Sequence, residues 1–180
     1  MKKRIHVFGA SGAGTTTIAK IVSKQLGYKH FDSDNYFWLP TINPFTIERE
    51  RNECLKMMDE DLSKNDEWVL SGSIANWGNI LVPYFDLVIF VYVPPEIRLE
   101  RLKKREYERY GNEIIEGGNR YKECQDFLSW ASAYDDGTRN GRSLARHEKW
   151  LKNINCPTQR ITNIDLAASV EAVMQTIVSE

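Results

Sequence analysis

Short apolar runs alternate along the chain with stretches in which apolar residues recur every three or four positions. The first run, Ile5 to Phe8, ends in a glycine, and apolar residues then recur at helical spacing from Ile18 to Leu26, where Gly27 supplies a stop. This opening predicts a strand, a loop and a helix. Further strands are predicted at Lys29 to Asp32, Trp68 to Leu70, Leu87 to Val93 and Gln159 to Thr162.

Helical spacing returns between these runs. It recurs from Leu144 to Leu151, from Leu166 to Ile177, and through Ile47, Cys54, Met58 and Leu62. Strands that alternate with helices predict a parallel sheet covered on both faces. Two connections exceed a minimal crossover, with 33 residues in 34–66 and 65 residues in 94–158. Connections of that length usually contain lids or substrate-binding segments.

The composition is that of an ordinary globular protein, because 42% of the 180 residues are apolar and 27% are charged. A formal charge of -1 gives no global attraction for a nucleic acid polymer or an anionic membrane. The longest apolar run is too short to span a bilayer, and the one after Met1 to Arg4 is too short for export. Three widely spaced cysteines fit neither a disulfide framework nor a zinc site. We therefore expect reduced thiols in a cytoplasmic protein.

The loop between the first strand and the first helix has the spacing of a phosphate-binding loop, G-x-x-x-x-G-K-[ST], with Thr15 at the lysine position. Glycines let backbone N–H groups turn inward as an anion nest, and the start of the helix adds its positive end. Thr16 falls where a hydroxyl binds Mg²⁺. The residues expected to bind phosphate are Gly9, Ser11, Gly12, Ala13, Gly14, Thr15, Thr16 and Thr17.

Two other interpretations of this loop remain open. It could be a tight turn without a ligand, or a dinucleotide loop, because Asp32 or Asp34 follows about 20 residues on, where a ribose-binding acid is expected. Three consecutive threonines, from Thr15 to Thr17, are less suited to the close packing of a dinucleotide fold. The chain also has no Tyr-x-x-x-Lys pair. Both observations favour the phosphate loop.

Four segments in this order resemble the kinase branch of the P-loop proteins, which includes adenylate kinase, shikimate kinase and the bacterial topology-modulation proteins. They are the loop 9–16, Phe31 to Asp34, Val69 to Ser73 and the helix holding Arg101 to Arg105. The resemblance implies a single α/β domain over 1–180, a three-layer sandwich whose five-stranded parallel sheet has the order 2-3-1-4-5. It also implies an acceptor-binding insert at about 34–66, a helical lid with its following helices at about 106–155, and ATP and Mg²⁺ as cofactors.

By the same resemblance, Asp32 belongs to the Mg²⁺ shell and Asp34 binds or activates the acceptor hydroxyl. Phosphoryl transfer needs positioning and charge neutralisation more than covalent help, so two carboxylates at a strand end suit it. The turn Ser71 to Ser73 resembles the turn that approaches the acceptor in small-molecule kinases, although Ser71 replaces a frequent metal-organising aspartate. Alternatively, the two acids are solvated turn residues.

Arginines are the candidates to replace the missing lysine. Arg98, Arg101 and Arg105 are spaced so that their guanidinium groups share one helix face. The resemblance brings arginines at the spacing of Arg101 and Arg105 to the nucleotide. Arg142 and Arg146 could close in as lid arginines. The alternative is a solvent face of salt bridges, because glutamates are interleaved with the first group.

We therefore expect an ATP-dependent phosphotransferase that acts on a nucleotide, nucleoside or small hydroxyl compound, with lid arginines standing in for the lysine. A non-catalytic nucleotide-binding sensor is the alternative, motivated by Thr15 and Ser71 together. The acceptor and the oligomeric state cannot be deduced. Aromatic residues could line an acceptor pocket or belong to the core, and the histidines fit no ligand spacing and are expected to be structural. These are Tyr36, Phe37, Trp38 and Phe45, and His6, His30 and His147.

Overall fold

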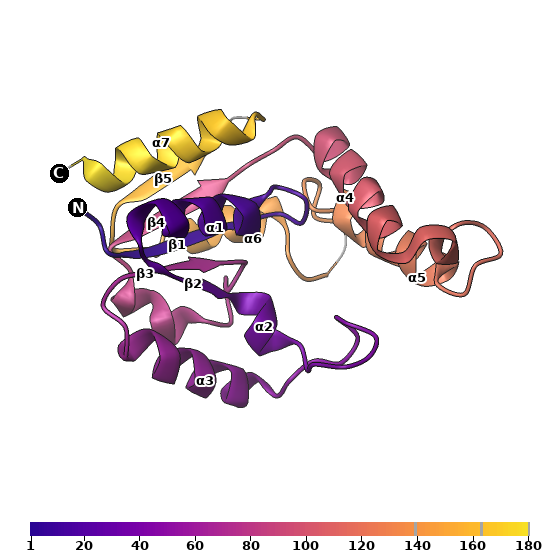
Figure 1. Ribbon diagram of the computed structural model, residues 1–180, viewed down its shortest axis with the longest axis horizontal. Helices are drawn as coiled ribbons and strands as arrows, with labels where there is room; N and C mark the ends of the chain where they lie inside the picture. The colour runs from indigo at the N-terminus through magenta and orange to yellow at the C-terminus, as the bar shows by residue number, and fades with distance from the viewer. Residues whose placement is uncertain (139, 163, 180) are drawn as a thin grey trace.

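Five parallel strands form the centre of the molecule in the order β2-β3-β1-β4-β5, as expected (Figure 1). The computed structural model describes residues 1–138, 140–162 and 164–179. In the register of the sheet, Val7 pairs with Ser71 and Gly9 with Val91. The carboxyl ends of the strands therefore meet at one edge. The strands are β1 (Arg4–Gly9), β2 (Lys29–Asp32), β3 (Trp68–Ser71), β4 (Leu87–Val91) and β5 (Thr158–Ile161).

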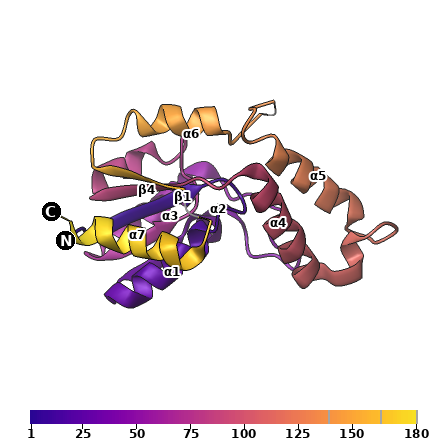
Figure 2. The ribbon, with the colours of Figure 1, turned by 90° about the horizontal axis from the view of Figure 1, so that it is seen from above.

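Helices cover both faces of this sheet. The α-helices are α1 (Thr15–Leu26), α2 (Ser33–Phe37), α3 (Arg51–Ser63), α4 (Pro95–Tyr110), α5 (Tyr121–Ser132), α6 (Leu144–Leu151) and α7 (Leu166–Val178), with 3₁₀ helices η1 (Asn79–Tyr84) and η2 (Gly111–Ile114). Figure 2 shows α1 and α7 on one side and α6 on the other, while α4 and α5 project away as a hairpin. This arrangement confirms the three-layer sandwich. None of the described helices is long and apolar enough to cross a membrane.

The strands alternate their side chains between two apolar layers. Val7 and Ile89 face α1 and α7, in a layer that also buries Ile18 and Val173. The neighbouring residues Phe8, Leu70 and Phe90 face the other way, against α3, η1 and α6. Burial on both faces explains why β4 is apolar at every position. The three cysteines are free thiols.

One boundary differs from the sequence pattern. Ile47 was expected to share the helical stripe of Cys54, but α3 begins at Arg51, after a cap in which the Glu50 carboxylate accepts from Glu53 N at 2.9 Å. Ile47 instead lies in an extended segment, where its carbonyl accepts from Leu39 N at 2.9 Å, and it is half-exposed. The cap and this backbone pairing together override the periodicity.

The two long connections face each other. The insert loop, residues 38–50, contacts the hairpin of α4 and α5 through two arginines. The Arg109 guanidinium stands 5.4 Å from the centroid of the Phe45 ring, and Arg120 Nη1 donates to Asn43 Oδ1 at 3.4 Å. The insert loop and the hairpin therefore meet across the carboxyl edge of the sheet.

Candidate active site

The loop between β1 and α1 folds tightly against the first turn of α4. Gly12 and Gly14 adopt left-handed backbone angles, with φ of 82° and 89°. A Cβ on Gly12 would stand 2.6 Å from the carbonyl oxygen of Arg98, so only glycine allows both the angle and the close approach. The helix start at Thr15 directs its free N–H groups to the same place. This part of the loop is therefore shaped to hold an anion.

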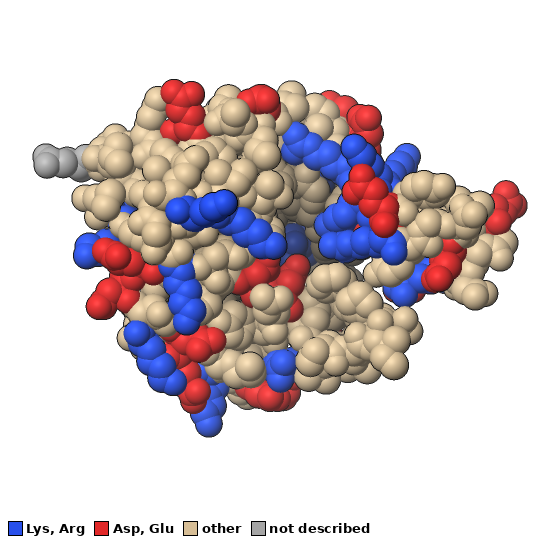
Figure 3. All heavy atoms as spheres, viewed as in Figure 1, with Lys and Arg blue, Asp and Glu red and all other residues tan. Residues whose placement is uncertain are grey.

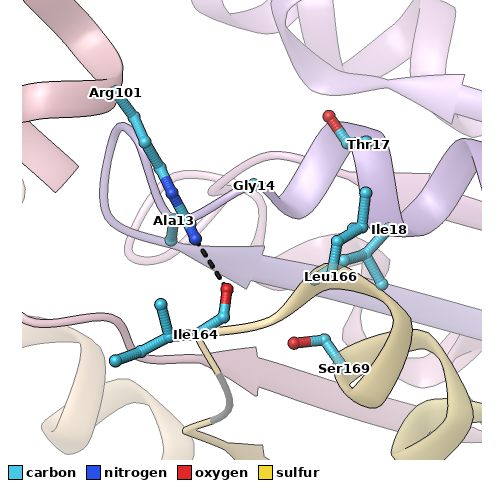
Figure 4. Close-up of a pocket in the computed structure, with 8 residues that line it drawn as sticks. All are labelled: Ala13, Gly14, Thr17, Ile18, Arg101, Ile164, Leu166 and Ser169. Carbon is cyan, nitrogen blue, oxygen red and sulfur yellow. Dashed lines mark hydrogen bonds between the residues drawn. The ribbon is translucent and has the colours of Figure 1, made fainter. Parts of the chain in front are cut away.

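A cavity of about 240 Å³ opens beside the loop. Arg101 reaches along it, and its Nη2 donates to the Ile164 carbonyl oxygen at 2.7 Å (Figure 4). The Nη1 of the same residue lies 3.9 Å from where a side chain on Gly14 would begin. The volume is below the roughly 300–1,000 Å³ of pockets that enclose a whole drug-sized ligand, so the cavity suits one part of a ligand. It is lined by Ala13, Gly14, Thr17, Ile18, Arg101, Ile164, Leu166 and Ser169.

Thr16 and Asp32 are brought together at the ends of α1 and β2. Thr16 Oγ1 donates to Asp32 Oδ2 at 3.0 Å, and Asp32 Oδ1 caps α2 by accepting from Asp34 N at 3.1 Å. Within the described ranges, no group of three or more His, Cys, Asp or Glu gathers to hold a metal. Mg²⁺ in phosphate sites usually takes one or two carboxylates and completes its shell with phosphate and water. The Thr16–Asp32 pair therefore fits this ion.

Asp34 lies in the first turn of α2. Figure 3 shows acidic and basic side chains meeting at a hollow near the middle of this face of the molecule. The Asp34 side chain is exposed, but the surrounding protein partly desolvates its carboxyl group and so raises its pKa. The negative charge of Asp32 raises this pKa further. The charges of Arg142, Arg105 and Arg109 act in the opposite direction. Asp34 therefore binds a proton more readily than an ordinary aspartate does.

Each of the three arginines whose charge acts on Asp34 lies over an aromatic ring. The pairs are Arg105 with Phe127 at 5.7 Å, Arg109 with Phe45 at 5.4 Å and Arg142 with Trp130 at 5.9 Å. Arg105 also donates to the Glu106 carboxylate at 2.8 Å. Within residues 1–138, 140–162 and 164–179, the Arg142 guanidinium has neither a hydrogen bond nor an ion pair. Arg142 therefore retains all its donors for a ligand.

Arg98 departs from the expectation that it shares a face with Arg101 and Arg105. It is fully buried, donates to the carbonyl oxygens of Val93 and Ser11 at 2.9 and 3.4 Å, and forms an ion pair with Asp135. From the first turn of α4, Arg98 contacts the loop at Gly12 and at the Ser11 carbonyl. Because Arg98 is buried and already paired, the three guanidinium groups do not form one phosphate-facing set.

Two further groups were not singled out from the sequence. Arg109 continues the spacing of Arg101 and Arg105 by one more turn, so the i+4 repeat could have found it. A buried chain of hydrogen bonds joins Tyr134 Oη to His147 Nδ1 at 2.8 Å and His147 Nε2 to Ser73 Oγ at 2.9 Å. Ser73 lies 74 residues before His147 and Tyr134 lies 13 residues before it, and no sequence spacing signals these contacts.

The remaining candidates are placed as follows. Arg146 is exposed on α6, whose buried residues are His147 and Trp150. Tyr36 belongs to the core and donates to Asp61 at 2.8 Å, whereas the Phe45 ring is 44% exposed. Phe37 and Trp38 are half-buried, and their ring centroids lie 4.9 Å apart. His6 is buried and bonded to the Leu70 carbonyl, and desolvation lowers its pKa to about 3.

Comparisons with known proteins give relatives over most of the chain. The model of a family described as AAA domain matches residues 5–128. A relative, the uncharacterized protein YqaC of Bacillus subtilis, is 48% identical over 161 residues, which cover 89% of each chain. A cytidylate kinase of Archaeoglobus fulgidus is 32% identical over 57% of this chain and 62% of its own.

Solved structures show the same fold. The shikimate kinase from Acinetobacter baumannii in complex with shikimate superposes with a TM-score of 0.60 at 18% identity. The match covers 98% of this chain and 93% of that one. A likeness at this identity establishes the architecture and leaves the substrate open.

Proposed function

Because this chain belongs to the AAA domain family, within the P-loop kinase superfamily, we propose that it is an ATP-dependent phosphotransferase acting on a small hydroxyl-bearing acceptor. The observation that carries the proposal is the convergence of a phosphate-binding loop, the Thr16–Asp32 pair and a carboxylate, Asp34, at one edge of the sheet. A single site with these three parts can hold a nucleoside triphosphate and an acceptor side by side.

The donor half of the site consists of the loop and the adjoining cavity. Backbone N–H groups of the loop would hold the phosphates, and the cavity beside Arg101 has room for the base. Thr16 and Asp32 would hold Mg²⁺, which neutralises charge on the β- and γ-phosphates when bound. Gly12, packed against α4, keeps the loop in its anion-binding shape before a ligand arrives.

The acceptor half is built around Asp34. An acceptor hydroxyl oxygen would attack the γ-phosphorus as the bond to the β–γ bridging oxygen breaks and ADP leaves. Asp34 would take the hydroxyl proton and return it to solvent. The free donors of Arg142, with Arg105 and Arg109 nearby, suit an acceptor that itself carries an anionic group. We therefore propose an anionic acceptor, such as a phosphorylated or carboxylated compound.

The lysine missing at Thr15 leaves the loop without its usual cation, and the position of Arg101 supports it as the replacement. Charge-assisted hydrogen bonds to phosphate contribute about 1.5–3 kcal/mol. We expect Arg101→Ala to lower kcat/KM for MgATP about ten- to a hundredfold, and Arg101→Lys to recover part of the loss. Steady-state kinetics checks this.

Lys104→Ala is the matched control for Arg101→Ala. It removes a positive charge from the same helix, but at an exposed side chain whose partner, Glu108, is 3.9 Å away. Kinetics of Lys104→Ala should match those of the native protein. If Arg101→Ala also left MgATP kinetics unchanged, another group would have to supply the charge.

Titration calorimetry with MgATP and with NADH tests the proposed function directly. We expect binding of MgATP at micromolar concentrations, weaker binding without Mg²⁺, and no binding of NADH. A coupled ADP-release assay over phosphorylated and carboxylated acceptors should then reveal transfer. Binding of MgATP with no transfer to any acceptor would favour a non-catalytic nucleotide-binding sensor, the alternative that Thr15 and Ser71 suggest. Binding of NADH alone would overturn the phosphate-loop interpretation.

A further inference from the structure

His147 is held at both ring nitrogens in the core beneath the site. It is 1% exposed, and its ring packs edge-on against Phe8 and Phe90, with centroids 4.9 and 5.9 Å away. Nδ1 meets the hydroxyl of Tyr134, and Nε2 meets the hydroxyl of Ser73. A neutral imidazole donates one of these hydrogen bonds and accepts the other. The chain of three side chains is therefore fully satisfied without a net charge.

The hydrogen-bond chain of Tyr134, His147 and Ser73 connects the start of α6 to two other parts of the fold. Ser73 follows β3 on the acceptor-side turn, and Tyr134 follows α5. The backbone adds to the connection, because Leu144 N donates to the Tyr134 carbonyl at 2.8 Å and His147 N to the Ser143 carbonyl at 3.0 Å. The first turn of α6 is consequently fixed in position.

Arg142 stands immediately before this fixed turn. Its charge acts on the pKa values of Tyr134, His147 and Asp34. Its guanidinium also lies over the Trp130 ring, 5.9 Å from the centroid. With no hydrogen bond of its own among the described residues, the guanidinium depends on these surroundings for its direction.

We propose that Tyr134 and His147 are positioning residues, which hold the Arg142 guanidinium toward Asp34 through their hydrogen-bond chain to Ser73. The proposal rests on the proposed function in that the acceptor is the ligand Arg142 would meet. A neutral imidazole at His147 suits this role, because an imidazolium there would repel Arg142. Burial and the charge of Arg142 lower the pKa of His147 to about 3, and burial raises that of Tyr134.

The test removes one hydroxyl from the chain and compares it with a hydroxyl removed elsewhere. Tyr134→Phe keeps the ring but breaks the bond to His147. Tyr84→Phe is the control, because its hydroxyl donates to Asp59 at 2.7 Å, between η1 and α3 and outside this hydrogen-bond chain. We expect Tyr134→Phe to raise the acceptor KM or lower kcat about five- to tenfold, the loss of roughly one hydrogen bond. The KM for MgATP should not change.

A second readout does not depend on activity. The Arg142 Nε–Hε signal in a ¹⁵N spectrum, assigned with Arg142→Lys, should be sharp in the native protein and in Tyr84→Phe, and broadened in Tyr134→Phe. An unchanged signal in Tyr134→Phe would overturn the proposal, as would equal losses for acceptor and MgATP. If Tyr134→Phe does not fold, Ser73→Ala gives the same comparison from the other end. Absence of phosphoryl transfer in the native protein would refute the proposed function alone, because the spectrum would still report on Arg142.

Discussion

Asp34→Asn is expected to lower kcat of phosphoryl transfer by about 10²–10⁴, the range in which a positioned general base contributes. Asparagine preserves the size of the side chain and its place in the first turn of α2, but it cannot accept the hydroxyl proton. MgATP binding should persist, since the loop and the Thr16–Asp32 pair are untouched. A coupled ADP-release assay and calorimetry together check this.

The pH dependence of the native protein provides a check on the same residue. Because enclosure and Asp32 raise the pKa of Asp34 above its ordinary value of 3.8, activity should fall on the acid side at a higher pH than for an ordinary aspartate. Asp126→Asn, an exposed carboxylate on α5, is the control and should leave kcat unchanged. Transfer at the native rate by Asp34→Asn would remove Asp34 from the mechanism.

Asp34→Asn should increase the stability of the fold at neutral pH, although it lowers turnover. A raised pKa means that the folded state disfavours the ionised form of Asp34, so this residue favours folding below its unfolded pKa and opposes it as pH rises through the folded pKa. Asp34→Asn should therefore have a higher melting temperature than the native protein at pH 7, and the difference should vanish near pH 3. A gain in stability with a loss of turnover separates a functional role from a folding defect.

Asp135→Ala is expected to destabilise the fold by about 3–5 kcal/mol, because it leaves the guanidinium of Arg98 buried without its counter-charge. For a chain of this size the loss corresponds to a fall in melting temperature of roughly 6–20 °C. MgATP binding should also weaken, since Arg98 bonds the Ser11 carbonyl in the loop. Thermal unfolding and calorimetry measure the two effects.

An exposed ion pair of the same charge type is the control for Asp135→Ala. Asp126→Ala breaks the Lys122–Asp126 pair, in which the two side chains are 90% and 66% exposed, and pairs of this kind contribute at most about 1 kcal/mol. Equal melting temperatures for Asp135→Ala and Asp126→Ala would show that the Arg98–Asp135 ion pair does not stabilise the fold.

The fold was largely predictable because its signals are local. Short runs of residues typical of strands marked β1, β2, β3 and β4 to within two residues. The start of α3 was missed because a cap at Glu50 and the pairing of Leu39 with Ile47 outweigh an apolar repeat. Periodicity alone does not report such local hydrogen bonds.

The site was predictable where it follows the chain and unpredictable where distant segments meet. The loop spacing singled out Thr16 and the family resemblance singled out Asp32, and the structure joins the two at 3.0 Å. Helical spacing gave Arg98 the same face as Arg101, but a carboxylate 37 residues away, on Asp135, draws Arg98 into the core. The contacts of His147 with Tyr134 and Ser73 likewise depend on tertiary packing, which single-sequence spacing does not encode.

The meeting of the insert loop with the hairpin of α4 and α5 bears on how such a protein diversifies. Its contacts come from loop and helix-end residues, Asn43 and Phe45 on one side and Arg109 and Arg120 on the other. None of these four residues belongs to the two buried layers that hold the sheet together. Surface loops tolerate substitution better than cores do. Selection can therefore reshape the contact between the insert loop and the hairpin one residue at a time, while the two buried layers and their stability are inherited intact.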